Sequence, residues 1–413
     1  MDSYDALCRW VDAHHGEQVD FLREIVRVPS DTPPGDNAPA AERAASLLGS
    51  LGFAVERHPV PPDFLREHGM RSVTNLIVRE RFDVGGPTVA LNAHGDVVPP
   101  GEGWTKPPYE GVIEDGRMYA RGVAVSKSDI ATYTYALAAL RTLASQGVPL
   151  KGAVELHFTY DEEAGGLAGP AYLLHRHLTR PDFAIAASFS YAVVTAHNGC
   201  LQLEITIHGK SGHGAMPQTG RDAFRAGAAV LNAIYAEADA LAATKSHVRG
   251  IDHPTMIVGL MAGGINTNVV PDRLTLRLDR RMIPEEDPDT VENGLRAIVA
   301  QTIDRFDGIR VDVKRVLLAR ALRPLPGHEK LAAAIARHGK RIFGADIPAV
   351  GVPLYSDARL YGEHGVPIVM YGAGPRTLVE SNAKQPDENL LLEDLRRATQ
   401  VVACTVHDIL LSD

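Results

Sequence analysis

Short apolar segments alternate with amphipathic segments along most of the chain, and this alternation limits the fold more than any other feature. Four runs have the length and composition of buried strands, at 87–94, 152–159, 183–188 and 367–372. Helical periodicity occupies the segments 39–52, 129–147, 165–178, 329–343 and 390–411. This order predicts βαβ units, and therefore an α/β domain with a mostly parallel twisted sheet flanked by helices.

The middle of the chain has a different pattern. Residues 201–209 and 274–282 alternate apolar and polar side chains, which is typical of strands with one face in water. Two amphipathic helices accompany these strands. The sequence therefore predicts an inserted α/β sandwich at 198–317, interrupting a larger domain built from 1–197 and 318–413.

Composition excludes several classes of protein. The 413 residues have a net charge of −9 and no Lys/Arg run of the kind that binds nucleic acid. No apolar run approaches the roughly 20 residues of a membrane span, and the start lacks a signal-peptide pattern. Cys8, Cys200 and Cys404 are widely spaced, which fits a reducing compartment. We therefore expect a cytoplasmic protein that acts on a small molecule, without nucleic-acid or membrane partners.

Two polar segments follow predicted strands. His94 and Asp96 lie two residues apart, so they point to the same face, where the carboxylate can orient the imidazole. In a chain with 17 histidines, a chance pairing is the alternative. The residues 161–163, Asp-Glu-Glu, are either a solvated loop or a general base beside a metal ligand. Both segments lie at the carboxyl ends of strands, where sheets of this class bind ligands.

Taken together, the motifs resemble the dinuclear zinc aminoacylase/carboxypeptidase family, which includes acetylornithine deacetylase, succinyl-diaminopimelate desuccinylase and glutamate carboxypeptidase. The similarity extends over nearly the whole chain, through HGD at 94–96, DGRMYARG at 115–122, DEEAGG at 161–166, GKSGHGAMP at 209–217, GGINTNVVPD at 263–272 and SDAR at 356–359. The resemblance implies a catalytic domain that holds two zinc ions with a shared water molecule. It also implies an inserted lid domain through which two copies form a homodimer.

The resemblance assigns roles to four residues of the catalytic domain. His94 matches a histidine ligand and Asp96 its orienting partner. Glu162 matches the general base, and Glu163 matches a metal ligand.

The resemblance also assigns roles in the lid. His213 matches the histidine that helps to stabilise the oxyanion in the partner subunit's site. Asn268 and Arg281 match residues that bind the substrate. The forked guanidinium of an arginine suits a substrate carboxylate.

Three positions depart from the family pattern, and each departure removes a metal ligand. Val125 stands where the RGxxDxKG motif has its bridging aspartate, and Asp129 would need a register shift to replace it. After the strand at 183–188, Ser188 or Ser190 stands where an acid is expected. Lys384 replaces the histidine of the AHxxDE motif. We count Ser188 among the candidate substrate-binding residues.

These departures leave too few ligands for a dinuclear centre. One metal would retain only His94 and the other only Glu163, whereas a zinc ion needs three or four protein ligands. We therefore expect no cofactor, and zinc only if the ligand count is misread. Ser126, beside the vacated aspartate position, is a further candidate for substrate binding.

Three functions remain open at this stage. The first is a repurposed, metal-independent enzyme that forms, transfers, cyclises or hydrolyses an amide of a small carboxylate-bearing amino-acid derivative. There Glu162 would move a proton, His94 would be a second acid or base, and Lys384 would supply positive charge or pair with a glutamate. The second is a conventional metal-dependent hydrolase of N-acyl amino acids or dipeptides. The third is a ligand-binding protein without catalysis.

Overall fold

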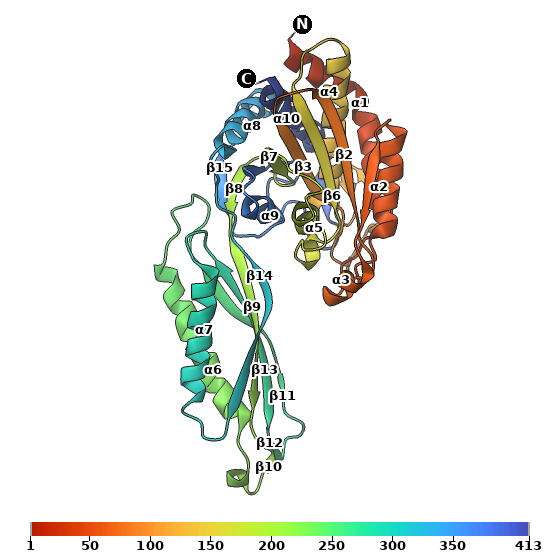
Figure 1. The fold of residues 1–413 in the computed structure, drawn as a ribbon. Helices are drawn as coiled ribbons and strands as arrows, with labels where there is room; N and C mark the ends of the chain where they lie inside the picture. Colours follow the sequence, from red (N-terminus) through yellow and green to blue (C-terminus); the bar gives the residue numbers. More distant parts are fainter. Residues whose placement is uncertain (1, 412–413) are drawn as a thin grey trace. The chain divides into compact units, whose positions relative to one another are not determined.

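The computed structural model describes residues 2–411, which form two compact units (Figure 1). Unit 1 comprises the chain up to Thr195, Pro324–Val350 and the part from Ser356 onward. Unit 2 comprises Ala196–Arg323 and Gly351–Tyr355. The second unit is an insertion in the first, and it takes in a short later segment in addition to the expected central part of the chain.

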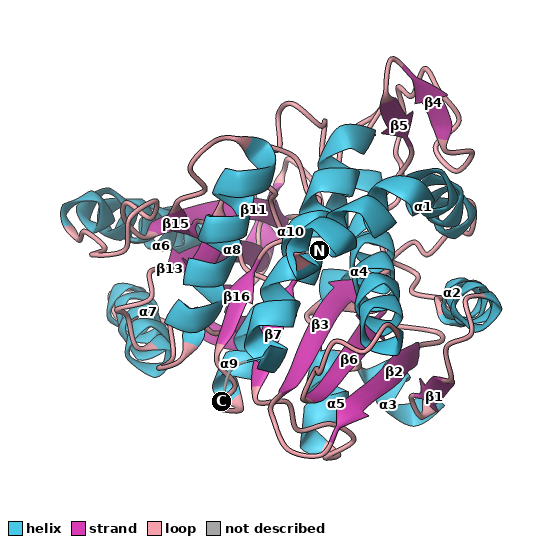
Figure 2. Cartoon of the chain, turned by 90° about the horizontal axis from the view of Figure 1, so that it is seen from above, coloured by secondary structure: helices cyan, strands magenta, loops and turns pink. Residues whose placement is uncertain are grey.

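Unit 1 contains an eight-stranded sheet with the order β1-β2-β6-β3-β7-β16-β8-β15. Its strands are β1 (Val55–Pro59), β2 (Thr74–Asp83), β3 (Thr88–His94), β6 (Gly152–Thr159), β7 (Phe183–Ala186), β8 (Val193–His197), β15 (Ala349–Val352) and β16 (Ile368–Met370). The central strands β6, β3, β7 and β16 are parallel, whereas β2 and β8 pair with their inner neighbours in the antiparallel sense. Figure 2 shows the central strands side by side. The α/β class and all four expected strands are confirmed.

Helices cover this sheet. They are α1 (Ser3–Val26), α2 (Ala38–Ser50), α3 (Pro62–Glu67), α4 (Ser128–Ser145), α5 (Pro170–His175), α8 (His328–Phe343), α9 (Ala358–Glu363) and α10 (Leu392–Leu411). Helix α4 packs on β2, β3 and β6 and also contacts α1 and α10. Its buried residues lie on every side, which is typical of a helix enclosed in a core. This central helix positions the loops at the carboxyl ends of the parallel strands.

Four helices of unit 1 differ from the sequence prediction, and two of them are the short helices α3 and α9, which the patterns did not predict. The patterns did not predict α1, because many polar residues lie between the apolar ones. Its buried stripe includes Leu7, Val11 and Leu22. The helix expected at 165–178 is shorter, because Gly165 and Gly166 have positive φ angles and form a turn before α5 begins. A small sheet of β4 (Val112–Glu114), β5 (Arg117–Tyr119) and β17 (Asn389–Leu391) completes unit 1.

Unit 2 is an antiparallel sheet with two helices on one face (Figure 1). The sheet has the order β11-β13-β9-β14, formed by β9 (Gly199–His208), β11 (Thr255–Gly263), β13 (Arg273–Met282) and β14 (Arg310–Ala319). The helices are α6 (Ala223–Ala240) and α7 (Pro288–Ile303). Alternate residues of β9 and β13 are buried beneath these helices, as the alternation predicts. Within residues 2–411, no helix combines the length and the apolar character needed to cross a membrane.

Candidate active site

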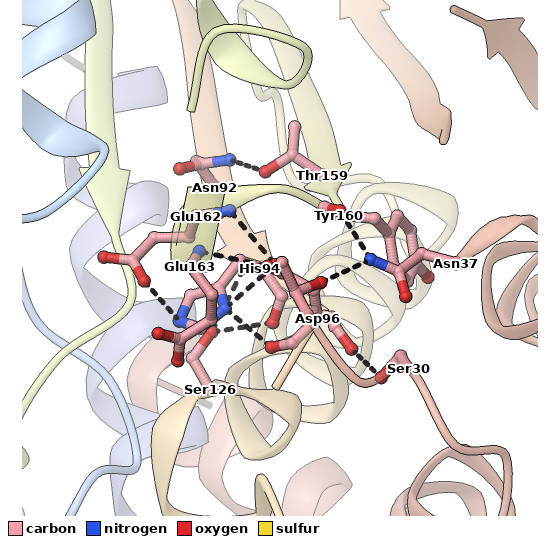
Figure 3. Close-up of polar contacts among 12 residues, drawn as sticks. Ser30, Asn37, Asn92, His94, Asp96, Ser126, Thr159, Tyr160, Glu162 and Glu163 are labelled. Carbon is pink, nitrogen blue, oxygen red and sulfur yellow. Dashed lines mark hydrogen bonds and ion pairs between the residues drawn. The ribbon is translucent and has the colours of Figure 1, made fainter. Parts of the chain in front are cut away.

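His94 and Asp96 lie at the carboxyl end of β3, and their side chains approach each other (Figure 3). Nδ1 of His94 is 3.0 Å from the carbonyl oxygen of Asp96 and 3.3 Å from its Oδ1. Because a carbonyl oxygen only accepts hydrogen bonds, Nδ1 carries a proton. Nε2 is therefore the nitrogen that faces Glu162, 4.0 Å from Oε2.

Asp96 also holds the acidic segment that follows β6. Its buried Oδ1 accepts the backbone N–H of Glu162 at 3.1 Å, and its Oδ2 accepts that of Glu163 at 3.0 Å. The sequence predicted only the orientation of His94, whereas the structure gives this carboxylate two anchoring bonds as well. Gly95 permits the close approach of the two loops, because a Cβ there would lie 2.3 Å from the ring of Tyr160.

Ser126 fixes the backbone of His94. Its hydroxyl donates to the His94 carbonyl at 2.9 Å and accepts the His94 N–H at 3.1 Å. Ser126 is buried, and these two bonds use its hydroxyl hydrogen and one of its lone pairs. The structure therefore shows that Ser126 positions the backbone of His94, and its role in substrate binding stays a prediction. Val125 precedes it and offers no donor atom.

Lys384 and Glu163 form an ion pair. The Lys384 ammonium lies 2.7 Å from Oε2 of Glu163, whose side chain is 8% exposed, while the Lys384 side chain is 50% exposed. Burial lowers the pKa of Lys384, but the neighbouring Glu163 and Glu162 carboxylates outweigh it and raise the pKa above its ordinary value. Of the two roles that the sequence left open for this lysine, the structure shows the pairing with a glutamate.

Glu162 and His94 form a pair of acid and base in which His94 is buried and the Glu162 side chain is 13% exposed. Burial raises the pKa of Glu162 to about 7, and Glu163 adds to the rise, while His94 and Lys384 oppose it. Burial lowers the pKa of His94, but Glu162, Asp96 and Glu163 outweigh that effect and raise it to about 10. The pair therefore combines a positively charged imidazole with a carboxyl group whose pKa lies near neutral pH.

Asp129 lies at the start of α4 and uses its carboxylate on backbone groups. Its Oδ1 accepts the N–H of Ala373 at 2.6 Å, and the carboxylate also accepts the N–H of Ser188. Burial raises its pKa to about 7. Gly372 is required beside it, because a Cβ there would lie 2.1 Å from Oδ1. Asp129 thus joins the loops after β7 and β16, and the Ser188 side chain belongs to one of these loops.

The sequence analysis missed a second layer of acids behind Glu162. Asp161 is buried and accepts the N–H of Ala168 at 2.5 Å, and burial together with Asp96 raises its pKa to about 8. Asp357 is also buried, and its pKa lies well above the ordinary value because of burial and the charge of Asp161. The SDAR motif contained this signal, but the motif alone did not indicate that the aspartate is buried.

Unit 2 holds the three predicted lid residues, at two places. His213 in β10 (Gly212–His213) lies beside Asn268, which precedes β12 (Val269–Val270); the carbonyl of Asn268 accepts the N–H of Gly214 at 2.8 Å. Both residues are exposed. Arg281 lies near the opposite end of β13, where Nε donates to Asp279 Oδ1 at 2.7 Å. Its guanidinium also lies 5.6 Å from the centre of the Tyr355 ring.

The residues present do not fit the dinuclear zinc centre that the resemblance implies. In the described part of the chain, no three His, Cys, Asp or Glu side chains are grouped so that they could hold a metal ion. Val125 has no donor atom, and the Lys384 ammonium contacts the carboxylate of Glu163. A cation at close range repels a second cation, so this contact disfavours a metal at Glu163.

The fold and these residues define an amidohydrolase of the metallopeptidase type, in which an α/β unit with an HxD and a Glu-Glu motif carries an inserted α/β unit. The chain belongs to peptidase family M20/M25/M40, whose model matches residues 90–408. It is thus an enzyme of the M20 amidohydrolase type, and the resemblance drawn from the motifs is confirmed.

Individual relatives agree with this family. Succinyl-diaminopimelate desuccinylase of Rhodospirillum centenum is 27% identical over 400 residues, covering 93% of this chain and 95% of that protein. Acetylornithine deacetylase of Myxococcus xanthus is 28% identical over 379 residues, covering 90% and 92%. The fold is similar to the di-peptidase Dug1p from Saccharomyces cerevisiae (TM-score 0.79, 14% identity, both chains fully covered). It is also similar to the M20 family metallo-carboxypeptidase Sso-CP2 from Sulfolobus solfataricus (TM-score 0.75, 17% identity, 96% and 100% covered).

Proposed function

We propose that this M20 enzyme acts on an amide bond of a small carboxylate-bearing amino-acid derivative without a dinuclear zinc centre. The observation that supports the proposal is the Lys384–Glu163 ion pair, with Nζ 2.7 Å from Oε2, at a position where the family motif has a metal-binding histidine. The ammonium supplies positive charge beside the general base Glu162, where the family has metal ions. Together with Val125 at the bridging position, it replaces a metal site by an electrostatic one.

The proton transfers can be assigned to side chains of this chain. A substrate atom about 2.8 Å from both Glu162 Oε2 and His94 Nε2 fits between groups that are 4.0 Å apart. Glu162 would take the proton of the attacking group and return it to the departing nitrogen. His94, with Nδ1 held by Asp96, would donate a hydrogen bond to the oxygen that gains charge.

Val125 and Lys384, which stand at two ligand positions of the family, favour a substrate that carries its own nucleophile. A metal ion is the usual means of lowering the pKa of water towards 7, and water is otherwise a weak nucleophile at neutral pH. An amine or carboxylate within the substrate would not need this activation, so we favour cyclisation or acyl transfer over hydrolysis. The relatives named above are a desuccinylase and a deacetylase, so N-succinyl and N-acetyl amino acids are the first compounds to examine.

We further propose a homodimer in which unit 2 completes the site. His213 and Asn268 lie near the start of β13 and Arg281 near its end, about 8 residues or roughly 27 Å along the strand. One copy of unit 2 therefore presents them as two separate groups. A second copy would allow both groups to reach substrate, with Arg281 binding a carboxylate.

The test of this function has two measurements. The first is elemental analysis of the purified protein after incubation with zinc and dialysis, for which we expect well below one zinc per chain. The second is a mass-spectrometric screen of N-acyl amino acids that carry a free amine, with and without a chelator. We expect turnover that the chelator leaves unchanged and that falls by about 10²- to 10⁴-fold in Glu162→Gln. Two zinc ions per chain, with activity lost to a chelator and restored by zinc, would instead establish a conventional hydrolase.

A pair of reversions tests the electrostatic replacement directly. Val125→Asp with Lys384→His restores two ligands beside Glu163, which gives the three protein ligands of a single zinc site. We expect this double variant to retain about one zinc per chain after dialysis. The matched control is Val125→Asp with Lys384→Met, which removes the same ammonium without adding an imidazole and should retain little. Equal zinc contents in the two variants would contradict the proposed correspondence of Lys384 with the family's histidine.

A further inference from the structure

Helices α1 and α10 pack in an antiparallel pair whose register is set by two hydrogen bonds. The Tyr4 hydroxyl donates to Oδ1 of Asp408 at 2.7 Å, and Nε2 of Gln400 donates to Oδ1 of Asp12 at 2.7 Å. The two contacts are eight residues apart on each helix. The contact nearer the start of α1 is the one nearer the end of α10, so the two helices are antiparallel. The facing surfaces are therefore aligned over more than two turns.

Cys8 and Cys404 lie midway between these contacts. Each cysteine is four residues, about one helical turn, from both hydrogen-bonded neighbours on its own helix, so both lie on the facing surfaces. In keeping with these positions, each thiol is the main influence on the pKa of the other. Cys8 is half-buried and Cys404 is fully buried, while the third cysteine, Cys200, lies in unit 2 beside Asp279. The first and last helices of unit 1 thus bring two thiols together from opposite ends of the sequence.

The two thiols are chemically unequal. The neighbouring Cys404 thiol lowers the pKa of Cys8, burial opposes this, and the nearby Arg341 guanidinium lowers the pKa further, so that the net shift is downward. The neighbouring Cys8 thiol and burial both raise the pKa of Cys404. The more exposed sulfur is therefore also the one that forms a thiolate more readily, which is the nucleophilic form of cysteine.

We propose that Cys8 and Cys404 are a redox site that a hydroperoxide converts reversibly into a disulfide joining α1 to α10. The Cys8 thiolate attacks one oxygen of hydrogen peroxide, forms a sulfenic acid and releases hydroxide. The Cys404 sulfur then attacks the Cys8 sulfur, and the hydroxyl group leaves as water with the Cys404 proton. The two thiols lose two electrons in total, and one peroxide is reduced to two molecules of water. A dithiol reverses the reaction.

The bond would cross-link the chain almost end to end. It would close a loop of nearly 400 residues, and the stabilisation from a disulfide increases with loop length in the chain-entropy model. None of the residues placed in the active site lies in α1 or α10. We therefore expect the disulfide to raise the thermal stability of unit 1, by roughly 5–10 °C in melting temperature, and to leave turnover unchanged.

The test uses the whole protein. It is treated with a small excess of hydrogen peroxide, alkylated, digested without reduction and examined by mass spectrometry. We expect one peptide that links Cys8 to Cys404 and is two hydrogens lighter than the two separate peptides, with Cys200 still alkylated as an internal control. Thiol titration of the unfolded protein should fall from three groups to one, and a dithiol should restore all three.

Two variants separate this site from general oxidation. Cys200→Ser should form the same link, whereas Cys404→Ser should stop at a sulfenic acid on Cys8 and gain no thermal stability. The proposal would be overturned if wild-type Cys8 proceeds to sulfinic acid without cross-linking, or if it pairs only with a second chain. The main test uses the wild-type sequence, so the proposal can be decided even if a variant folds poorly.

Discussion

A buried ion pair connects the loop of Lys384 to the segment that bears Val125, and its removal gives a sharp test of the site's architecture. Nη1 of Arg121 lies 2.5 Å from Oε2 of Glu388, and their side chains are 1% and 2% exposed. The other oxygen of Glu388 accepts the N–H of Ala124 at 3.0 Å. Glu388→Ala would therefore leave a buried guanidinium and a buried N–H without their acceptor.

The expected loss follows from these contacts. Breaking a buried pair from one side typically costs about 3–5 kcal/mol, because the remaining charge is uncompensated. The N–H of Ala124 loses its acceptor in the same substitution, and we do not add a separate cost for it. We therefore expect Glu388→Ala to lower the free energy of unfolding by about 4 kcal/mol, which is nearly a thousandfold in the unfolding equilibrium. The control is Arg121→Met combined with Glu388→Leu. This double variant leaves no charge behind and should recover most of the loss.

The chain offers a convenient assay. Its two tryptophans, Trp10 and Trp104, both lie in unit 1, so their fluorescence during guanidinium denaturation follows this unit. Trp104 lies 5.1 Å from the Arg121 guanidinium, so the comparison is made in a Trp104→Phe background with Trp10 as the probe. A loss below about 1 kcal/mol in Glu388→Ala would refute the reasoning. So would a double variant as unstable as the single one.

Three further outcomes are expected. Lys384→Met should lower stability by only about 1 kcal/mol, because the side chain is half-exposed, yet lower turnover by about 100-fold, as thermal denaturation and steady-state kinetics would show. A second outcome concerns Glu155, whose pKa is lowered from 4.5 to about 2. Burial alone would raise this pKa, but a neighbouring histidine, threonine and arginine outweigh burial. Its contribution of about 3 kcal/mol is thus present above pH 4.5 and lost as the pH falls towards 2, and Glu155→Gln should flatten that limb of an acid titration of stability. Gly372→Ala should destabilise by about 1–3 kcal/mol through its clash with Asp129, whereas Gly49→Ala, with open space around it, should not.

Local patterns were sufficient to predict much of the fold. The apolar runs that became β3 and β6 are short, bounded and followed at once by polar residues, so strand ends and site residues could be placed together. His94, Asp96, Glu162 and Glu163 meet because both strands are parallel neighbours that end at the same edge. The lid strands were equally clear, because one face is wet and the alternation is strict.

Contacts between distant segments could not be predicted in the same way. The hydroxyl of Ser126 bonds the backbone of His94, and Asp129 bonds Ala373, across 32 and 244 residues respectively. Nothing in the local sequence around Ser126 or Asp129 specifies such a partner. Helix α1 was missed for a related reason. Its apolar stripe is narrow, and such a helix is stabilised mainly by packing against a core that the local sequence does not reveal.

The double anchoring by Asp96 changes what a conservative substitution means at this position. Asparagine matches aspartate in shape and is often used to remove a charge while retaining the geometry. Here both carboxylate oxygens accept backbone N–H groups, from Glu162 and Glu163, and an amide has only one oxygen. Asp96→Asn would set an NH₂ group against an N–H, so the segment carrying the general base would move. A loss of activity in that variant would therefore report the displacement of Glu162 as well as the lost charge beside His94.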